Sequence, residues 1–251
     1  MEGFVKSEII NGVGTVTFFH PQSNSMPGIQ LRNLAAEIEK LGKDDNVKVI
    51  VLKSEGEKAF CAGASFDELI SIKDIDTGLK FFSGFAMVIN AMRKAPKFII
   101  ARVQGKAVGG GVGIASSADY TFATESASVK LSELAVGIGP FVVGPAVERK
   151  LGSSAFCQLT INATEWQTAS WAKEKGLYAE LFNSTEEMDK GIELLSGKLA
   201  NSNPEAMAML KKVMWQGTEN WDTLLIERAG MSGKLVLSEF TINAINKFKG
   251  K

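Results

Sequence analysis

The chain has 251 residues, 45% of them hydrophobic, and its 28 lysine and arginine residues balance 28 aspartate and glutamate residues. This length supports a large buried core, while the neutral balance and the lack of long basic runs argue against a nucleic-acid-binding surface. No signal peptide is evident at the N-terminus, and the longest apolar stretch, residues 134–147, is interrupted by glycine and proline. It is also shorter than the ~20 residues that a membrane helix needs, so we expect a cytoplasmic protein that does not enter membranes.

The first half of the chain alternates between strand and helix patterns. Residues 5–10 and 13–19 are predicted to form a hairpin, with Asn11-Gly12 at the turn. Pro27 is predicted to open a helix that runs to Gly42. Further along, the patterns predict a strand at 47–53, a helix at 78–94 that Pro96 stops, a buried strand at 98–103 and a strand at 119–123.

Helical patterns dominate from about Ser153 onward. Helices are predicted at 153–161, 168–175, 185–200, 204–215 and 221–248. Strands that alternate with helices and then give way to helices favour an α/β core with a C-terminal helical extension. We divide the chain into a core, residues 1–190, and a C-terminal helical region, residues 191–251.

The two cysteines and the single histidine give little sign of chemistry. Cys61 and Cys157 lie far apart and are expected to be free, buried thiols in a reducing cytoplasm. Without a Cys/His cluster, no metal site is predicted. His20 precedes Pro21, where a turn is expected, and this favours a structural role over that of a catalytic base.

A glycine-rich run follows the strand at 98–103. Residues 104–119 read QGKAVGGGVGIASSAD, with glycine at 109, 110, 111 and 113. Glycine lets backbone N–H groups approach a ligand closely, at a point where a helix is predicted to begin. The run lacks the last glycine of a dinucleotide-binding motif, because Ser116 takes its place, and it lacks the GK[ST] of a P-loop.

Two other segments carry candidate functional groups. Residues 58–69, KAFCAGASFDEL, place small residues around Gly63 before a predicted helix start, where the main chain is accessible. Residues 129–152 hold Glu133 in an apolar, glycine-rich neighbourhood. Two interpretations of Glu133 stay open: a buried carboxyl with a raised pKa that acts as acid or base, or an exposed acid at a helix start.

Together, FCAGASFDEL, KAVGGGVGIASSADYTFA and LSELAVGIGP resemble the crotonase (enoyl-CoA hydratase/isomerase) superfamily. The resemblance covers most of the chain and implies an α/β fold built as a spiral of ββα units, with a C-terminal helical trimerisation region. It implies an acyl-CoA thioester as substrate, no separate cofactor because coenzyme A is part of the substrate, and a homotrimer or dimer of trimers. It also implies varied chemistry on one scaffold.

By motif position, the resemblance assigns the catalytic roles to three residues. The backbone N–H groups of Ala64 and Gly110 would form an oxyanion hole for the thioester oxygen, and Glu133 would be the acid–base. The substrate-binding residues that it implies are Ser25, Met26, Ala62, Phe66, Gly109, Phe141 and Lys247.

The chain departs from typical hydratases of this family, which carry two glutamates. Here Gly113 occupies the first glutamate position and Glu133 the second. A single carboxylate suits proton transfer from C2 to C4 of a 3-enoyl thioester, so the pattern favours a Δ3–Δ2 enoyl-CoA isomerase. The alternatives are a hydratase, on a 2-enoyl or branched methylglutaconyl-type substrate, and an acyl-CoA binder without turnover.

Overall fold

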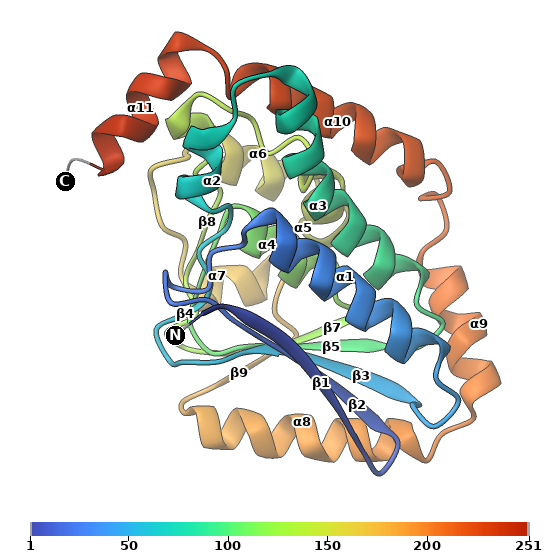
Figure 1. The fold of residues 1–251 in the computed structure, drawn as a ribbon. Coiled ribbons are helices and arrows are strands. Elements are labelled where there is room, and N and C mark those ends of the chain that lie inside the picture. The colour runs from blue at the N-terminus through green and yellow to red at the C-terminus, as the bar shows by residue number, and fades with distance from the viewer. Residues whose placement is uncertain (1, 250–251) are drawn as a thin grey trace.

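The computed structural model describes residues 2–249, and side chains up to residue 247. A six-stranded sheet runs through the molecule in the order β1-β2-β3-β5-β7-β9, and only the β1–β2 pair is antiparallel (Figure 1). Its strands are β1 (Phe4–Ile10), β2 (Val13–Phe19), β3 (Val49–Ser54), β5 (Ile99–Val103), β7 (Tyr120–Thr124) and β9 (Glu180–Phe182).

The predicted N-terminal hairpin is confirmed. Asn11 and Gly12 both have positive φ angles, 49° and 81°. A two-residue type I′ hairpin turn requires positive φ at both of its central residues. Val5 pairs with Phe18 across the ladder, so the register follows directly from the turn.

Helices cover both faces of this sheet (Figure 1). Helix α8 (Thr185–Ala200) contacts one face, while α1 (Gly28–Lys43) contacts the other and packs against α3 (Ile75–Lys94), which in turn packs against α10 (Trp221–Leu235). The predicted α1 is confirmed, with Pro27 directly before its first residue. Its fully buried stripe recurs at helical spacing because one side of the helix faces the core: Leu31, Leu34, Ile38 and Leu41.

A second, three-stranded parallel sheet was not predicted. It contains β4 (Ala59–Cys61), β6 (Lys106–Val108) and β8 (Val129–Lys130), in the order β4-β6-β8. Each of its strands follows a strand of the large sheet, so the chain repeats a ββα pattern through β3-β4-α2, β5-β6-α4 and β7-β8-η1. The expected α/β architecture of ββα units is thereby confirmed.

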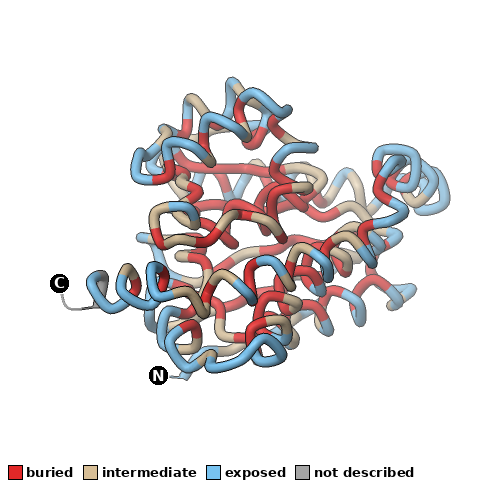
Figure 2. The backbone as a smooth tube through the Cα atoms, turned by 90° about the horizontal axis from the view of Figure 1, so that it is seen from above, coloured by how far each residue is buried: buried red, intermediate tan, exposed pale blue. Residues whose placement is uncertain are grey.

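The remaining helices fill the space around the two sheets. Buried positions concentrate in the strands and on the inward sides of the helices, as Figure 2 shows. These helices are α2 (Phe66–Ser71), α4 (Gly110–Ser116), η1 (Leu134–Val136), α5 (Gly144–Leu151), α6 (Ser153–Ile161), α7 (Ala169–Glu174), α9 (Pro204–Met214) and α11 (Glu239–Lys249).

Two sequence predictions are wrong. The single helix expected at 221–248 is two helices, because α10 ends at Leu235 and Ser238 caps the start of α11 by accepting a hydrogen bond from the Thr241 amide at 3.3 Å. Cys157 is a free thiol but exposed, because α6 turns Ala155 and Leu159 inward and Cys157 outward; Cys61 is free and buried, as expected. The division between residues 190 and 191 falls within α8 and stays a prediction.

A buried ion pair attaches α9 to the core. The Lys211 ammonium donates to Asp119 Oδ2 at 2.9 Å and to the carbonyl oxygens of Met92 and Lys97, and the Trp215 indole N–H donates to Asp119 Oδ1 at 2.8 Å. Both charged side chains are almost completely buried. Every hydrogen of the ammonium is therefore used, which such a buried pair needs to offset its desolvation.

We predict that Lys211→Met destabilises the protein by about 3–5 kcal/mol, because the Asp119 carboxylate would stay buried without its countercharge. Lys212→Met is the matched control, since Lys212 is exposed on the same helix. Urea unfolding measures both variants. Equal stabilities for the two would show that the pair does not hold α9 to the core.

Within residues 2–249, no helix is long and apolar enough to cross a membrane.

Candidate active site

A mainly apolar cavity of about 100 Å³ lies at the carboxyl edge of the small sheet. Because β4, β6 and β8 are parallel, the segments that follow them meet at this edge, as they do at the carboxyl ends of other parallel sheets. The three sequence motifs thus contribute to one cavity. It is lined by Ala62, Gly63, Ala64, Phe66, Leu69, Phe82, Phe85, Val108, Gly109, Gly110, Ser132, Glu133, Val136, Ile138, Gly139, Pro140, Phe141, Val142, Val143 and Ser232.

The turns after β4 and β6 touch through their backbones. A Cβ atom added to Gly63 would lie 2.8 Å from the Val108 carbonyl oxygen and 3.4 Å from the Gly110 nitrogen. Gly63 also has a φ of 85°, which favours glycine. In the described part of the chain, the N–H groups of Ala64 and Gly110 have no hydrogen-bond partner, and both residues line the cavity.

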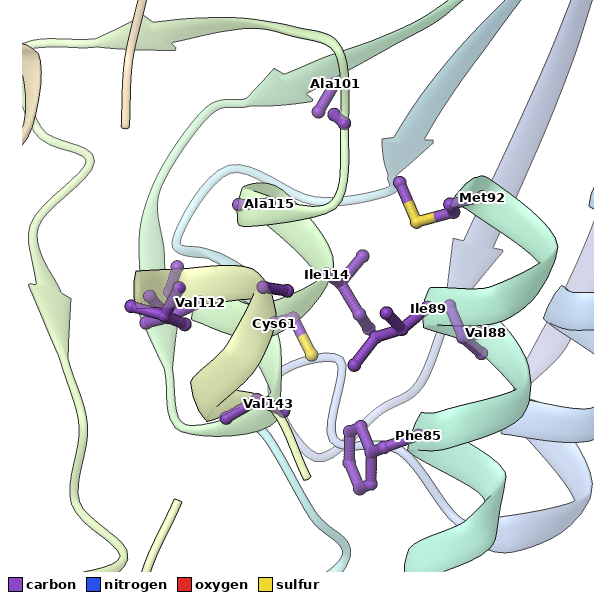
Figure 3. Close-up of a cluster of buried hydrophobic side chains, with 14 of the residues drawn as sticks. Cys61, Phe85, Val88, Ile89, Met92, Ala101, Val112, Ile114, Ala115 and Val143 are labelled. Atoms are coloured by element: carbon purple, nitrogen blue, oxygen red, sulfur yellow. The ribbon is translucent and has the colours of Figure 1, made fainter. Parts of the chain in front are cut away.

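The side chain of Phe85 fixes the position of Gly110. A Cβ at Gly110 would lie 2.1 Å from the Phe85 ring. The Phe85 side chain of α3 therefore packs directly against the backbone of Gly110, the first residue of α4. Figure 3 shows Phe85 and Ile89 of α3 directed toward α4 and Cys61. This packing is part of the main core and leaves the Gly110 backbone in a rigid setting.

The carboxyl of Glu133 lies over Gly109. Its Oε1 would be 2.9 Å from a Cβ at Gly109, so only glycine leaves room for it there. The residue is half-buried, but Oε2 is fully buried and has no hydrogen-bond partner among the described residues. Loss of hydration raises the pKa of the Glu133 carboxyl from 4.5 to about 7. The carboxyl is therefore poised between its two protonation states near neutral pH.

The sequence left two interpretations of Glu133: a buried carboxyl with a raised pKa, or an exposed acid at a helix start. Each describes part of the structure. The residue does start a short helix, because η1 begins at Leu134 and the Val136 amide donates to the Glu133 carbonyl oxygen at 3.2 Å. Its side chain nevertheless turns into the cavity and is buried there, as the first interpretation requires.

Gly113 has no space for a larger side chain. A Cβ at this position would lie 2.4 Å from Val143 Cγ1, so the isopropyl group of Val143 occupies the direction that a glutamate would take. Phe141, Val142 and Val143 all line the cavity and present apolar surface beside Glu133.

The other residues suggested by the resemblance divide into two groups. Ala62, Phe66 and Gly109 line the cavity, whereas Ser25, Met26 and Lys247 do not. Ser25 binds the His20 ring, with 3.1 Å between its Oγ and Nδ1, so His20 has a structural contact at the predicted turn. The Met26 amide donates to the Gly63 carbonyl oxygen at 2.8 Å and supports the β4 turn. The substrate-binding roles of Ser25, Met26 and Lys247 stay predictions.

Sequence reasoning missed the cavity wall that α3 and α10 provide. Phe82, Phe85 and Ser232 come from these helices and carry no local motif. The helical periodicity of α3 predicted that its phenylalanines are buried, but not which cavity they line.

Comparison with known proteins identifies the fold and the family. The structure superposes on the crystal structure of enoyl-CoA hydratase from Bacillus halodurans with a TM-score of 0.89, over 97% of this chain and 99% of that one, at 19% identity. That likeness shows the fold. A Bacillus subtilis protein, YngF, provisionally named an enoyl-CoA hydratase/isomerase, is 32% identical over 205 residues, which is 81% of this chain and 78% of its own length.

Two further matches agree. The short-chain-enoyl-CoA hydratase of Clostridium acetobutylicum is 28% identical over 239 residues, which is 94% of this chain and 90% of the relative. The family model of enoyl-CoA hydratase/isomerase matches residues 8–236. The chain belongs to the enoyl-CoA hydratase/isomerase family.

We predict that Glu133→Gln stabilises the protein at pH 8. Because the pKa of Glu133 is raised from 4.5 to about 7, the folded protein retains a proton that the unfolded chain releases, and stability falls as the pH rises through this window. The neutral amide avoids that loss of stability, which is about 3 kcal/mol above pH 7 and close to zero at pH 4. Urea unfolding at both pH values tests the prediction, and an equal effect at both would contradict the raised pKa.

Proposed function

We propose that the protein is a Δ3–Δ2 enoyl-CoA isomerase in which Glu133 is the only acid–base group. The observation that carries this proposal is the buried, unpartnered Oε2 of Glu133 in an apolar cavity, beside two backbone amides that have no partner among the described residues. No other carboxylate lines this cavity among residues 2–249.

In the proposed reaction, the amides of Ala64 and Gly110 hold the thioester oxygen. Glu133 removes a proton from C2, the electrons of that C–H bond form a dienolate, and the oxygen gains negative charge that the two amides stabilise. The protonated carboxyl then returns the proton at C4, and the double bond shifts from C3–C4 to C2–C3. Substrate and product have the same atoms, and the carboxylate is regenerated.

The apolar wall supports proton transfer rather than water addition. Hydration needs a water molecule that is held and activated, and a second carboxylate is the usual group for this task in the family. Here Val143 fills the space beside Gly113 where that group would stand. Apolar side chains around a proton-transfer site exclude competing water.

A hydratase is the second candidate, because the relatives support it. The Clostridium relative is named a short-chain-enoyl-CoA hydratase and matches nearly the whole chain. Purified protein offered 2-butenoyl-CoA distinguishes the two: water addition at a rate above that of 3-enoyl isomerisation would favour the hydratase. The third alternative, an acyl-CoA binder without turnover, predicts binding with neither reaction. The trimeric assembly also stays a prediction.

We predict that Glu133→Gln lowers kcat/KM for 3-hexenoyl-CoA isomerisation by at least roughly 100-fold, since general acid–base groups contribute 10²–10⁴. In the parent enzyme, kcat/KM should rise with pH and level off above about 7, because only the ionised Glu133 accepts a proton. Glu125→Gln is the control, as Glu125 is exposed and lies outside the cavity. Undiminished isomerisation in Glu133→Gln would refute the proposed role.

We predict that Gly113→Glu with Val143→Ala gains hydratase activity. Gly113→Glu alone should destabilise the protein by about 1–3 kcal/mol, because its side chain overlaps Val143. The added Val143→Ala opens room for a second carboxylate that can hold water.

The measurement for the double variant is the ratio of its hydration rate to its isomerisation rate. Val143→Ala alone serves as the control. If the ratio in the double variant equals that of the control, the absent second carboxylate does not explain the reaction preference.

A further inference from the structure

Ser232 is a polar residue on an otherwise apolar buried stripe of α10. The stripe recurs every three or four residues and faces α3, with Trp221, Leu225 and Ala229 before Ser232, and of these four residues only Ser232 lines the cavity. Ser232 is only 2% exposed. A serine at such a position costs free energy unless its hydroxyl finds a hydrogen-bond partner.

Close packing of two helices places Ser232 at the cavity. A Cβ added to Gly78 of α3 would lie 2.9 Å from the Gly233 Cα, so the backbones of α3 and α10 are in contact next to Ser232. This contact leaves no space for a side chain between the two helices. Ser232 therefore forms part of the cavity wall, together with Phe82 and Phe85 of α3.

The Ser232 hydroxyl has no hydrogen-bond partner within the part of the chain that the structure describes. Its backbone carbonyl accepts from the Val236 amide at 3.0 Å, but the side chain makes no such bond. Buried hydroxyls in proteins are normally satisfied. Because Ser232 is almost completely buried, lines the cavity and has an unpaired hydroxyl, that hydroxyl is positioned for a ligand atom.

The cavity that Ser232 lines is mainly hydrocarbon. The lining also contains Phe82, Val136 and Ile138, while Glu133 and Ser132 are its other polar side chains. A plain hydrocarbon acyl chain would satisfy those apolar groups and leave the Ser232 hydroxyl unpaired. An acyl chain with an oxygen atom beyond the reacting carbons would pair with it.

We propose that Ser232 is a specificity-determining residue that selects a short acyl group carrying a hydroxyl or carbonyl oxygen beyond the reacting carbons. This inference rests on the proposed function, because it requires the acyl chain of a CoA thioester to enter this cavity. Sites that hydrogen-bond a substrate oxygen discriminate against the analogue that lacks it, since the site's own polar group is then left unpaired.

The test compares the affinities of CoA thioesters that differ only by a hydroxyl in place of a methyl group. The pairs are 4-hydroxybutanoyl-CoA with pentanoyl-CoA, and 5-hydroxypentanoyl-CoA with hexanoyl-CoA, each titrated by calorimetry. These thioesters have no double bond, so binding is measured apart from isomerisation. In at least one pair, the parent protein should bind the hydroxy compound roughly 2- to 10-fold more tightly, which is the value of one net hydrogen bond.

Ser232→Ala should abolish that preference and leave the affinity for the methyl compound unchanged or slightly improved. Alanine favours the helix, so α10 is retained. Ser196→Ala is the matched control: Ser196 is also buried in a helix, but it lies on α8, and its hydroxyl donates to the Glu193 carbonyl oxygen at 3.2 Å. The control should keep the preference of the parent.

Each outcome decides between the claims. Equal affinities within both pairs, or a preference that survives in Ser232→Ala, would overturn the role of Ser232 even if 3-enoyl isomerisation is observed. A Ser232-dependent preference without isomerisation would keep this inference and refute the proposed reaction. Failure of all four thioesters to bind would overturn both.

Discussion

Contact between two backbone turns is the constraint on which the site depends. The turn after β4 lies against the turn after β6 so closely that a Cβ at Gly63 would meet the Val108 carbonyl oxygen at 2.8 Å. Because side chains are excluded from the contact between these two turns, the polar groups that the turns present to the cavity are main-chain amides. The small sheet produces this contact because its parallel strands end at one edge. Phe85 then holds Gly110 from the other side, so the amide positions belong to the rigid core rather than to a mobile loop.

The same packing determines what the single carboxyl can do. Glu133 fits over Gly109 because that residue has no side chain, and burial without a partner for Oε2 raises its pKa to about 7. The protein thereby gives up stability at neutral pH to keep a buried, ionisable carboxyl there, a trade that is common at functional sites. Val143 completes the arrangement, since it fills the volume where a second acid would stand. The proposed isomerase activity follows from one acid in apolar surroundings, not from any feature of the fold as a whole.

Sequence reasoning succeeded where a pattern is local. The α1 stripe and the Asn11-Gly12 turn each have signals within a few residues, and the spacing of three motifs was enough to identify the superfamily. The small sheet was missed because β8 has two residues and β4 and β6 have three, too few for periodicity. Ser232 was missed for another reason: it joins the cavity through a contact between Gly78 and Gly233, which are 155 residues apart in sequence. Such contacts leave no local trace in a single sequence.

Proton transfer by one carboxyl in a site that excludes water can be tested directly with an isotope. A 3-enoyl-CoA labelled with deuterium at C2 is converted by the protein in ordinary water, and the product is analysed for deuterium at C4 by mass spectrometry and NMR. The account predicts that a measurable share of the label moves from C2 to C4, because Glu133 returns the deuteron that it removed. Only solvent hydrogen at C4, with the removed deuteron wholly lost to water, or a 3-hydroxyacyl product in place of the 2-enoyl one, would contradict it.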